Sequence, residues 1–381
     1  MKICDITHFY CEKSGGVKTY LLKKVDYLGH NNLPGIEHFL ILPYHCDCLE
    51  RKNNSRFYFV KSPAVPLFKP YRTLISKRKI KKILTNEHPD IVEVGSPYMI
   101  PAWIKEFSKS LKYKVVGFYH AHIEATWNAV LKGFEGTLTK PSRAYIKKTY
   151  GDMDLVLAAS RYVEKYLNQL GISPTQIVHL GVDSDLFSTG KTDPNFRKEH
   201  NISENKRILL FTGRFAQEKR IFKLIDMFIA LNNLHKNKYH LVLLGGGPEE
   251  KKIRAMNIKE MTVIPFCSDK EKLVSIYNSA DIFVSASNSE TFGLTLLEAQ
   301  CCGLPVVAFQ ETSIPEIVVK KELLAETEND FIHNIDTIAN LLSDNLKSEI
   351  REQTVMHFSW DASFKKLFGI YHELCGSDSH S

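Results

Sequence analysis

The strongest constraint on the fold is an alternation of short apolar segments with longer amphipathic segments, which runs along the chain twice. Short apolar runs bounded by turn residues are typical of buried strands, and the longer segments have the periodicity of helices. Strands separated by helices predict parallel sheets with right-handed crossovers. Because 381 residues exceed the roughly 250–300 at which a single core stops growing, we expect two α/β domains.

Residues 1–187 are expected to form the first doubly wound, Rossmann-like domain. Helical patterns are found at 17–28, 71–85, 126–148 and after Ser160. The strands expected between them are 3–7, 39–42, 57–61, 91–94, 115–119, 155–158 and 176–180.

The pattern restarts after a polar stretch, 188–206, which contains Gly190 and Pro194 and is predicted to be the linker. Residues 207–358 are expected to form a second Rossmann-like domain, which faces the first across a cleft. Its expected strands are 207–212, 240–244, 262–265, 281–285 and 305–308, and its expected helices include 219–234, 270–279 and 293–302.

Composition excludes several functions. The formal net charge of +7 suits a polyanionic ligand or an anionic membrane face better than nucleic acid, so no nucleic-acid partner is expected. The first residues are too polar and acidic for a signal peptide, and no apolar run approaches the roughly 18 residues of a membrane span. We therefore expect a cytoplasmic protein.

The cysteines are expected to be reduced thiols. The eight cysteines are scattered along a long chain, which is typical of a protein in a reducing compartment. His45-Cys46-Asp47-Cys48 resembles part of a metal site, but no second cysteine/histidine pair follows at a suitable spacing. A zinc site is therefore not expected.

The most informative stretch is 289–303, SETFGLTLLEAQCCG, in which Glu290 and Glu298 stand eight residues apart. It follows the apolar segment 281–284, so the order is strand, small polar loop and helix. Ligands bind beyond the carboxyl ends of the strands in open α/β sheets, which is where Glu290 is expected. Glu298 lies about two turns further on, among apolar residues where an acid needs a partner. This favours a functional role over that of a solvated helical acid.

Two cations occupy a similar position after the strand 207–212. Arg214 and Lys219 are five residues apart at a strand-to-helix turn, which suits a diphosphate whose charge is spread over several oxygens. A solvated surface pair is the alternative, and spacing alone does not separate the two interpretations.

Other strand ends carry weaker signals. Gly15-Gly16 leaves backbone N–H groups for an anion, although many strand-to-helix turns need glycine for geometry alone. We interpret Gly245–Gly247 as a tight turn and Asp183–Asp185 as a structural turn, not as a metal-binding acid pair. His120 ends an apolar strand and is either a hydrogen-bonded packing residue or a functional one.

In order and spacing, these motifs resemble the retaining GT-B glycosyltransferases of family 4, a group that includes phosphatidylinositol mannosyltransferases and sucrose-phosphate synthases. The resemblance covers nearly the whole chain. It rests on residues 14–17, 118–120, 179–183, 213–214 with Lys219, 244–248, 280–284 and, most specifically, 290–294 with Glu298 and 302–307.

The resemblance implies a GDP- or UDP-sugar donor held mainly by the second domain and an acceptor held mainly by the first. Glu298 would accept hydrogen bonds from the ribose, Glu290 would contact the donor sugar, and backbone N–H groups near Gly293 would reach sugar hydroxyls or phosphate. The implied donor-binding residues are Gly15, Gly16, Gly213, Arg214, Lys219, Glu290, Phe292, Gly293, Leu294 and Glu298, and the implied catalytic residues are His120, Glu290, Arg214 and Lys219.

The resemblance also implies a mechanism without metal or cofactor. Arg214 and Lys219 would neutralise the diphosphate as it leaves, and Gly15-Gly16 would close over the same phosphates from the opposite domain. His120 would lie near the anomeric carbon, whose configuration would be retained by front-face attack. The last helix, 360–374, resembles one that crosses back to the first domain, so 359–381 is expected to pack there.

The sequence evidence about the acceptor comes from the basic segment 71–85, in which six lysine and arginine residues are interspersed with apolar ones. Such a segment suits docking to anionic lipid head groups at the inner face of the cytoplasmic membrane, and a solvated lysine-rich face is the alternative. We therefore expect a lipid-linked or cell-envelope glycan acceptor. Alternatives to transfer are another enzyme of this fold, such as a nucleotide-sugar epimerase or a phosphorylase, and a non-catalytic nucleotide-sugar-binding protein.

Overall fold

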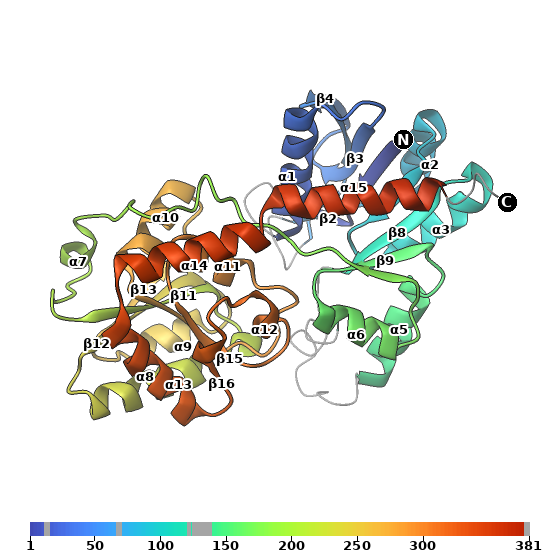
Figure 1. Ribbon diagram of the computed structural model, residues 1–381. Coiled ribbons are helices and arrows are strands. Elements are labelled where there is room, and N and C mark those ends of the chain that lie inside the picture. The colour runs from blue at the N-terminus through green and yellow to red at the C-terminus, as the bar shows by residue number, and fades with distance from the viewer. Residues whose placement is uncertain (11–15, 66–70, 120–122, 124–138, 377–381) are drawn as a thin grey trace. The chain divides into compact units, whose positions relative to one another are not determined.

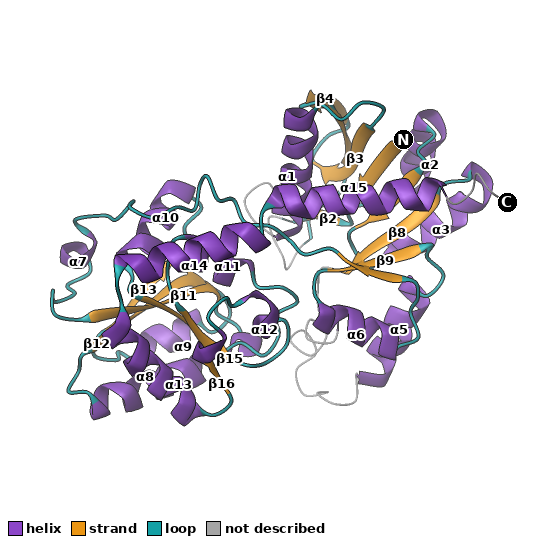
Figure 2. Ribbon diagram, viewed as in Figure 1, coloured by secondary structure: helices purple, strands orange, loops and turns teal. Residues whose placement is uncertain are grey.

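The computed structural model describes residues 1–10, 16–65, 71–119, 123 and 139–376, which fall into two compact units (Figure 1). Unit 1 contains Met1–Leu180 together with the C-terminal helix from Trp360, and unit 2 is Gly181–Ser359. Each unit is built on its own largely parallel sheet with helices between the strands, as Figure 2 shows. The prediction of two Rossmann-like α/β domains is therefore confirmed.

Within the described residues, unit 1 has an eight-stranded sheet in which β1 lies between β3 and β7. Neighbouring strands are parallel except at one edge, where β4 pairs antiparallel with β5. The strand order across the sheet is β10 (Thr175–Ile177), β9 (Leu155–Ala158), β8 (Lys114–Tyr119), β7 (Ile91–Val94), β1 (Lys2–Ile6), β3 (Glu37–Tyr44), β5 (Ser55–Lys61) and β4 (Cys48–Lys52).

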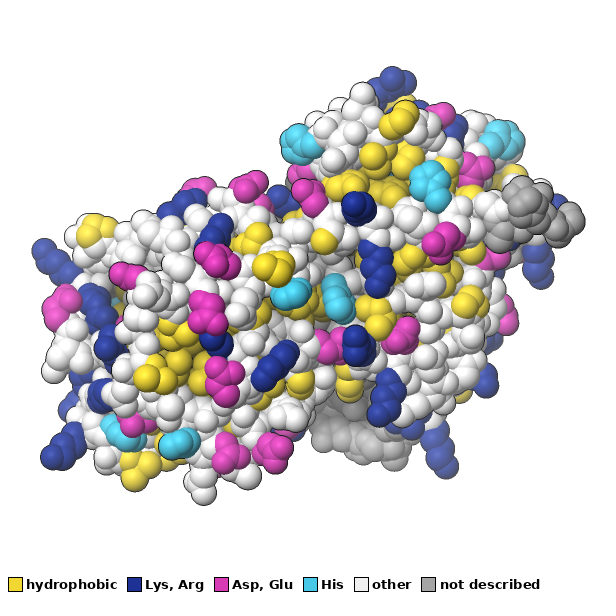
Figure 3. All heavy atoms as spheres, viewed as in Figure 1, with side chains coloured by type: hydrophobic (Ala, Val, Ile, Leu, Met, Phe, Trp, Pro, Cys, Tyr) yellow, Lys and Arg dark blue, Asp and Glu magenta, His cyan; other side chains and the backbone are white. Residues whose placement is uncertain are grey.

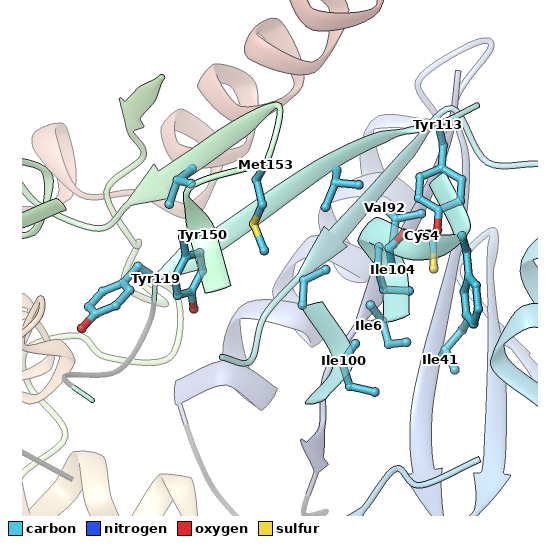
Figure 4. Packing of buried hydrophobic residues seen from close by; sticks show 14 of the residues in the cluster. Cys4, Ile6, Ile41, Val92, Ile100, Ile104, Tyr113, Tyr119, Tyr150 and Met153 are labelled. Atoms are coloured by element: carbon cyan, nitrogen blue, oxygen red, sulfur yellow. Dashed lines mark hydrogen bonds between the residues drawn. The ribbon is translucent and has the colours of Figure 1, made fainter. Parts of the chain in front are cut away.

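Helices bury the apolar faces of these strands. Figure 4 shows Ile100 and Ile104 packed beside Ile6 and Val92, all of them fully or almost fully buried. The strands read as continuous apolar runs because parallel sheets are covered on both faces. The described helices of unit 1 are α1 (Gly16–Asn31), α2 (Lys77–Glu87), α3 (Met99–Leu111), α5 (Thr139–Tyr150), α6 (Arg161–Gln169) and α15 (Trp360–Gly376).

The structure differs from the expectations for unit 1 at one helix and adds one strand. The basic helix predicted over 71–85 begins only at Lys77, because Arg72–Thr73 forms the short strand β6 and pairs with β2 (Phe9–Tyr10). The edge strand β4 was not expected, since its sequence is polar and its residues are largely exposed.

Unit 1 contains a buried cluster of charged groups that joins the sheet to α1 and α15. The Lys24 ammonium donates to Asp5 Oδ1 at 2.8 Å and to Glu93 Oε2 at 2.9 Å, and all three side chains are almost completely buried. His38 Nε2 lies 2.7 Å from Asp5 Oδ2, and the Tyr371 hydroxyl of α15 donates to Glu93. Burial alone would raise the pKa of Asp5, but Lys24 and His38 outweigh burial and hold this pKa at about 2.

Unit 2 has, within the described chain, a six-stranded sheet in which β11 lies between β12 and β14. All its strand pairs are parallel. The strand order is β13 (Met261–Pro265), β12 (Tyr239–Gly246), β11 (Arg207–Arg214), β14 (Ile282–Ser285), β15 (Val306–Phe309) and β16 (Leu324–Ala325).

The helices of unit 2 follow the predicted alternation. Helices α8 and α13 pack on a core that includes Leu209, Leu241 and Val284. The described helices are α7 (Phe196–Glu199), α8 (Ile221–Leu234), α9 (Glu250–Ala255), α10 (Lys270–Ser279), α11 (Leu294–Cys301), α12 (Ile314–Ile317), α13 (Glu328–Leu341) and α14 (Asp344–His357), with 3-10 turns η1 (Gln217–Lys219) and η2 (Lys321–Leu323).

The expected linker at 188–206 is instead part of unit 2, and the chain passes between units at Leu180–Gly181 and Ser359–Trp360. The stretch is polar, but Phe196 and Ile202 are 3% and 4% exposed and anchor it. Asn278 of α10 also donates to the Ser188 carbonyl at 2.9 Å. Apolar anchors and backbone contacts therefore outweigh a linker-like composition.

We predict that Lys24→Met destabilises unit 1 strongly. The variant would leave Asp5 and Glu93 buried without their cation, which costs about 3–5 kcal/mol in comparable buried pairs. The control is Lys82→Met, which removes an exposed lysine from the same unit and should change stability by less than about 0.5 kcal/mol. The stability of each variant is measured by urea unfolding, with hydrogen exchange in α1 and α15 as the probe of unit 1. Equal effects of the two variants would contradict the prediction.

Candidate functional site

The candidate site lies in unit 2, where the chain leaves β11 and β14 at their carboxyl ends. The chain moves from β11 to β12 on one side, and returns to β14 on the other side of β11. The strand order therefore reverses between β11 and β14, and ligands of open α/β sheets bind at such a point. Both predicted groups, Arg214 with Lys219 and the acidic loop with Glu290, follow these two strands.

Glycines allow the loops after β11 and β12 to approach each other closely. Gly213 and Gly245 are paired in register, and a Cβ at Gly245 would lie 1.9 Å from the Gly213 carbonyl oxygen. A Cβ at Gly247 would lie 2.5 Å from the Phe215 carbonyl oxygen. These contacts agree with the interpretation of Gly245–Gly247 as a geometric turn, and they give Gly213 a packing role as well.

Lys219 and Glu290, 71 residues apart in the sequence, are in direct contact. The Lys219 ammonium donates to Glu290 Oε1, and the two side chains are 20% and 13% exposed. The loops are also tied by backbone, because the Asn288 N–H donates to the Glu218 carbonyl at 3.3 Å. The structure therefore brings together a predicted cation and a predicted acid.

Arg214 lies beside this pair in sequence but has a different environment. It is the last residue of β11 and is exposed. Among the residues that the structure describes, no acceptor for its guanidinium is found. The neighbouring Arg220, which sequence reasoning missed, pairs with Glu311 at 2.9 Å. Arg214 is thus available for an anion, whereas Arg220 is already balanced.

The start of α11 is shaped by Gly293 and Ser313. Gly293 has a φ of +104°, and a Cβ there would lie 2.7 Å from Ile317 Cδ1. The Ser313 hydroxyl contacts the carbonyl oxygens of Glu290 and Phe292, each at 3.0 Å, which fixes the loop that enters the helix. Gly293 offers no side-chain cap, and its carbonyl oxygen accepts from the N–H groups of Leu296 and Leu297. The N–H groups of Leu294 and Thr295, in the first turn of α11, are left for another acceptor.

Glu298 is held by residues that the sequence did not identify. The Tyr277 hydroxyl of α10 donates to Glu298 Oε2 at 2.9 Å and lies 2.8 Å from the Thr212 hydroxyl of β11. Burial raises the pKa of Glu298 to about 7, despite the hydrogen bond from Tyr277. No sequence signal links Tyr277 to Glu298, because their contact depends on how α10 and α11 pack.

The remaining predicted residues belong to unit 1. Gly16 is the exposed first residue of α1. Gly15 and His120 lie outside the described residues, so their roles stay predictions.

In the described parts of the chain, no three His, Cys, Asp or Glu side chains gather in a way that would hold a metal ion. No helix in the same residues has both the length and the apolar character needed to cross a bilayer.

Comparison with known families covers most of the chain. The family described as glycosyl transferases group 1 matches residues 192–355, and the family described as glycosyltransferase family 4 matches residues 14–186.

Curated relatives are similar at low identity. The GDP-mannose-dependent alpha-(1-6)-phosphatidylinositol dimannoside mannosyltransferase of Mycobacterium tuberculosis is 26% identical over 84% of this chain and 82% of its own length. The sulfoquinovosyl transferase of Arabidopsis thaliana is 27% identical over 78% of this chain, and the match spans 59% of the plant protein. The N-acetyl-alpha-D-glucosaminyl L-malate synthase of Bacillus anthracis is 24% identical over 96% of this chain and 95% of its own length.

Solved structures share the fold over the whole chain. Sucrose-phosphate synthase from Thermosynechococcus elongatus has a TM-score of 0.76 at 19% identity and covers 99% of both chains. HepE from Anabaena, solved with UDP and glucose, has a TM-score of 0.70 at 14% identity, with 97% of this chain and 99% of that chain covered.

We predict that the unfolding free energy of the Glu298→Gln variant rises relative to that of the wild type as the pH rises. Because the folded-state pKa of about 7 lies above the ordinary 4.5, ionisation of Glu298 at higher pH costs folding free energy. Between pH 4 and pH 8 the unfolding free energy of the variant should gain about 3 kcal/mol relative to wild type. The matched control is Glu271→Gln, an exposed acid of α10, for which a constant difference is expected. A constant difference for Glu298→Gln in urea titrations would show that this carboxyl is not perturbed.

Proposed function

We propose that the chain, which has the GT-B fold and matches two glycosyltransferase family models, is a glycosyltransferase of the family 4 type that transfers a hexose from a nucleotide-diphosphate sugar to a lipid-linked or cell-envelope glycan. We propose further that the anomeric configuration is retained and that no metal ion takes part. The observation that carries the proposal is the contact of Lys219 with Glu290. Arg214 ends the strand that precedes Lys219, and Glu298 lies in the helix that follows Glu290.

Glu298 is proposed to hold the ribose. Tyr277 occupies one oxygen of its carboxylate, and ribose hydroxyls are donors that suit the other oxygen. The base is proposed to be guanine or uracil, since one relative is named as GDP-mannose-dependent and one neighbour was solved with UDP. A ribose that donates two hydrogen bonds would also favour the ionised carboxylate.

Arg214 and Lys219 are proposed to bind the diphosphate. Glu290 balances the charge of Lys219, and Arg214 has no acidic partner in the described part of the structure. An arriving diphosphate can share Lys219, which leaves Glu290 directed at the hydroxyls of the donor sugar. Backbone N–H groups at the start of α11, near Gly293, add to this anion site.

The two cations are proposed to drive bond cleavage. Negative charge grows on the diphosphate as the bond to the anomeric carbon breaks, and preorganised cations stabilise that charge. The acceptor hydroxyl then attacks from the face that the diphosphate leaves, and its proton passes to the departing phosphate oxygen. This order retains configuration without a covalent sugar–protein bond.

A basic helix supports peripheral attachment to an anionic membrane at its cytoplasmic face. Ile80 and Leu84 bury one side of α2, and Arg78 and Lys82 on the exposed side have no acidic partner among the described residues. Figure 3 shows basic and acidic side chains interspersed over the face it draws. Helix α2 by itself carries five lysine and arginine residues between Lys77 and Lys82. Juxtaposed lysine and arginine side chains attract anionic lipid surfaces.

We predict that Lys219→Met lowers kcat for transfer by about 10²–10³-fold, the usual effect of removing one group that stabilises transition-state charge. The control is Lys223→Met on α8, whose ammonium pairs with Glu328 at 3.0 Å and contacts none of the proposed site residues, so its loss should leave kcat near wild type. Release of nucleotide diphosphate from a panel of GDP- and UDP-sugars, with glycan and lipid acceptors, measures both. Interconversion of the donor without an acceptor would favour an epimerase, and donor binding without any turnover would favour a binding protein.

We predict that binding to anionic vesicles depends on α2. Removing two cations at a membrane surface should weaken binding by about 2 kcal/mol, so Arg78→Glu with Lys82→Glu should lose at least about 30-fold. The charge-matched control is Lys198→Glu with Lys259→Glu, at exposed positions of unit 2. Co-sedimentation at low and high salt measures both, and equal losses in the two double variants would refute docking through α2.

A further inference from the structure

Two thiols at the edge of the unit 1 sheet have no part in the proposed transfer reaction. His45-Cys46-Asp47-Cys48 joins β3 to β4, and Cys46 Sγ lies 3.7 Å from Cys48 Sγ. Both cysteines are half-buried. Cys48 also lines a cavity of about 340 Å³ together with Lys79 and Lys82 of α2.

We propose that Cys46 and Cys48 are a redox-active dithiol that closes to an intramolecular disulfide and thereby releases Lys79 from Asp47. The oxidant is a small-molecule disulfide such as oxidised glutathione. One cysteine thiolate attacks it to form a mixed disulfide and releases one glutathione thiol, and the other cysteine then displaces the second. In total the protein loses two electrons and two protons, and the oxidant is reduced to two thiols.

The geometry favours this pair over the other adjacent cysteines. A disulfide needs the sulfurs to close from 3.7 Å to about 2.05 Å, and only Asp47 lies between the two cysteines. Cys301 and Cys302 are also neighbours, but both are buried at the end of α11. Exchange with a dissolved disulfide requires an accessible sulfur, and Cys46 and Cys48 are only half-buried.

Closure has a consequence for α2 because Asp47 is bonded on two sides. Its Oδ1 accepts from the Lys61 N–H at 2.9 Å, and its Oδ2 accepts from the Lys79 ammonium at 2.6 Å. Closing the ring changes the backbone angles around Asp47, which lies between the two cysteines, and we expect its carboxylate to move away from Lys79. The freed cation adds to the charge of α2. Any effect on membrane binding rests on the proposed function, whereas the two measurements below do not.

The first measurement is a thiol map of the full-length protein across a glutathione series, from fully reduced to fully oxidised. Cys46 and Cys48 are the two cysteines of the tryptic peptide 25–51. On oxidation this peptide should become lighter by two hydrogen atoms and resist alkylation, whereas Cys46→Ser should retain a glutathione adduct at Cys48. Persistent glutathione on the wild-type peptide, alkylation of both thiols throughout, or a disulfide between two chains would overturn the proposal.

The second measurement is the rate at which an amine reagent modifies Lys79. Oxidation should raise this rate about twofold to fivefold, as expected for loss of an exposed ion pair, and Asp47→Asn should raise it equally without oxidant. Lys77 lies on the same helix as Lys79 and pairs with Glu106 of α3 at 2.6 Å; it is the matched control and should not respond. An unchanged Lys79 rate in the fully oxidised protein would show that closure does not release this lysine.

Discussion

The contact between Lys219 and Glu290 joins the two loops on which the candidate site depends. One loop follows β11 and the other follows β14, so the pair spans the point where the strand order reverses. Glycine packing at Gly213 and Gly245 places the first loop, and Ser313 holds the backbone of the second. Together with the backbone hydrogen bond from Asn288 to Glu218, the contact between Lys219 and Glu290 holds the two loops next to each other.

The two units treat buried charge in opposite ways. In unit 1, Lys24 lies between Asp5 and Glu93, so the buried acids are compensated within the fold and tie α1 to α15 through Tyr371. In unit 2, burial raises the pKa of Glu298, and its hydrogen bond comes from a neutral hydroxyl. A compensated cluster suits a structural role, and an acid without a direct cationic partner suits a site completed by its ligand.

Much of the fold could be predicted because apolar periodicity reports directly on buried strands and on helices. The positions of Glu290 and Arg214 followed from the same pattern, since each comes after a strand. The contacts of Tyr277 and Ser313 could not be predicted, because they depend on the packing of distant elements. The linker was misplaced because 188–206 is polar on average, although Phe196 anchors it.

The donor nucleotide is proposed to bind in unit 2, at the carboxyl ends of β11 and β14. A crystal structure of the protein soaked with UDP or GDP is the decisive test. We expect ribose hydroxyls at the carboxylate of Glu298 and the diphosphate within hydrogen-bond distance of Arg214 and Lys219. A nucleotide bound at another surface, or one whose ribose lies away from Glu298, would contradict it.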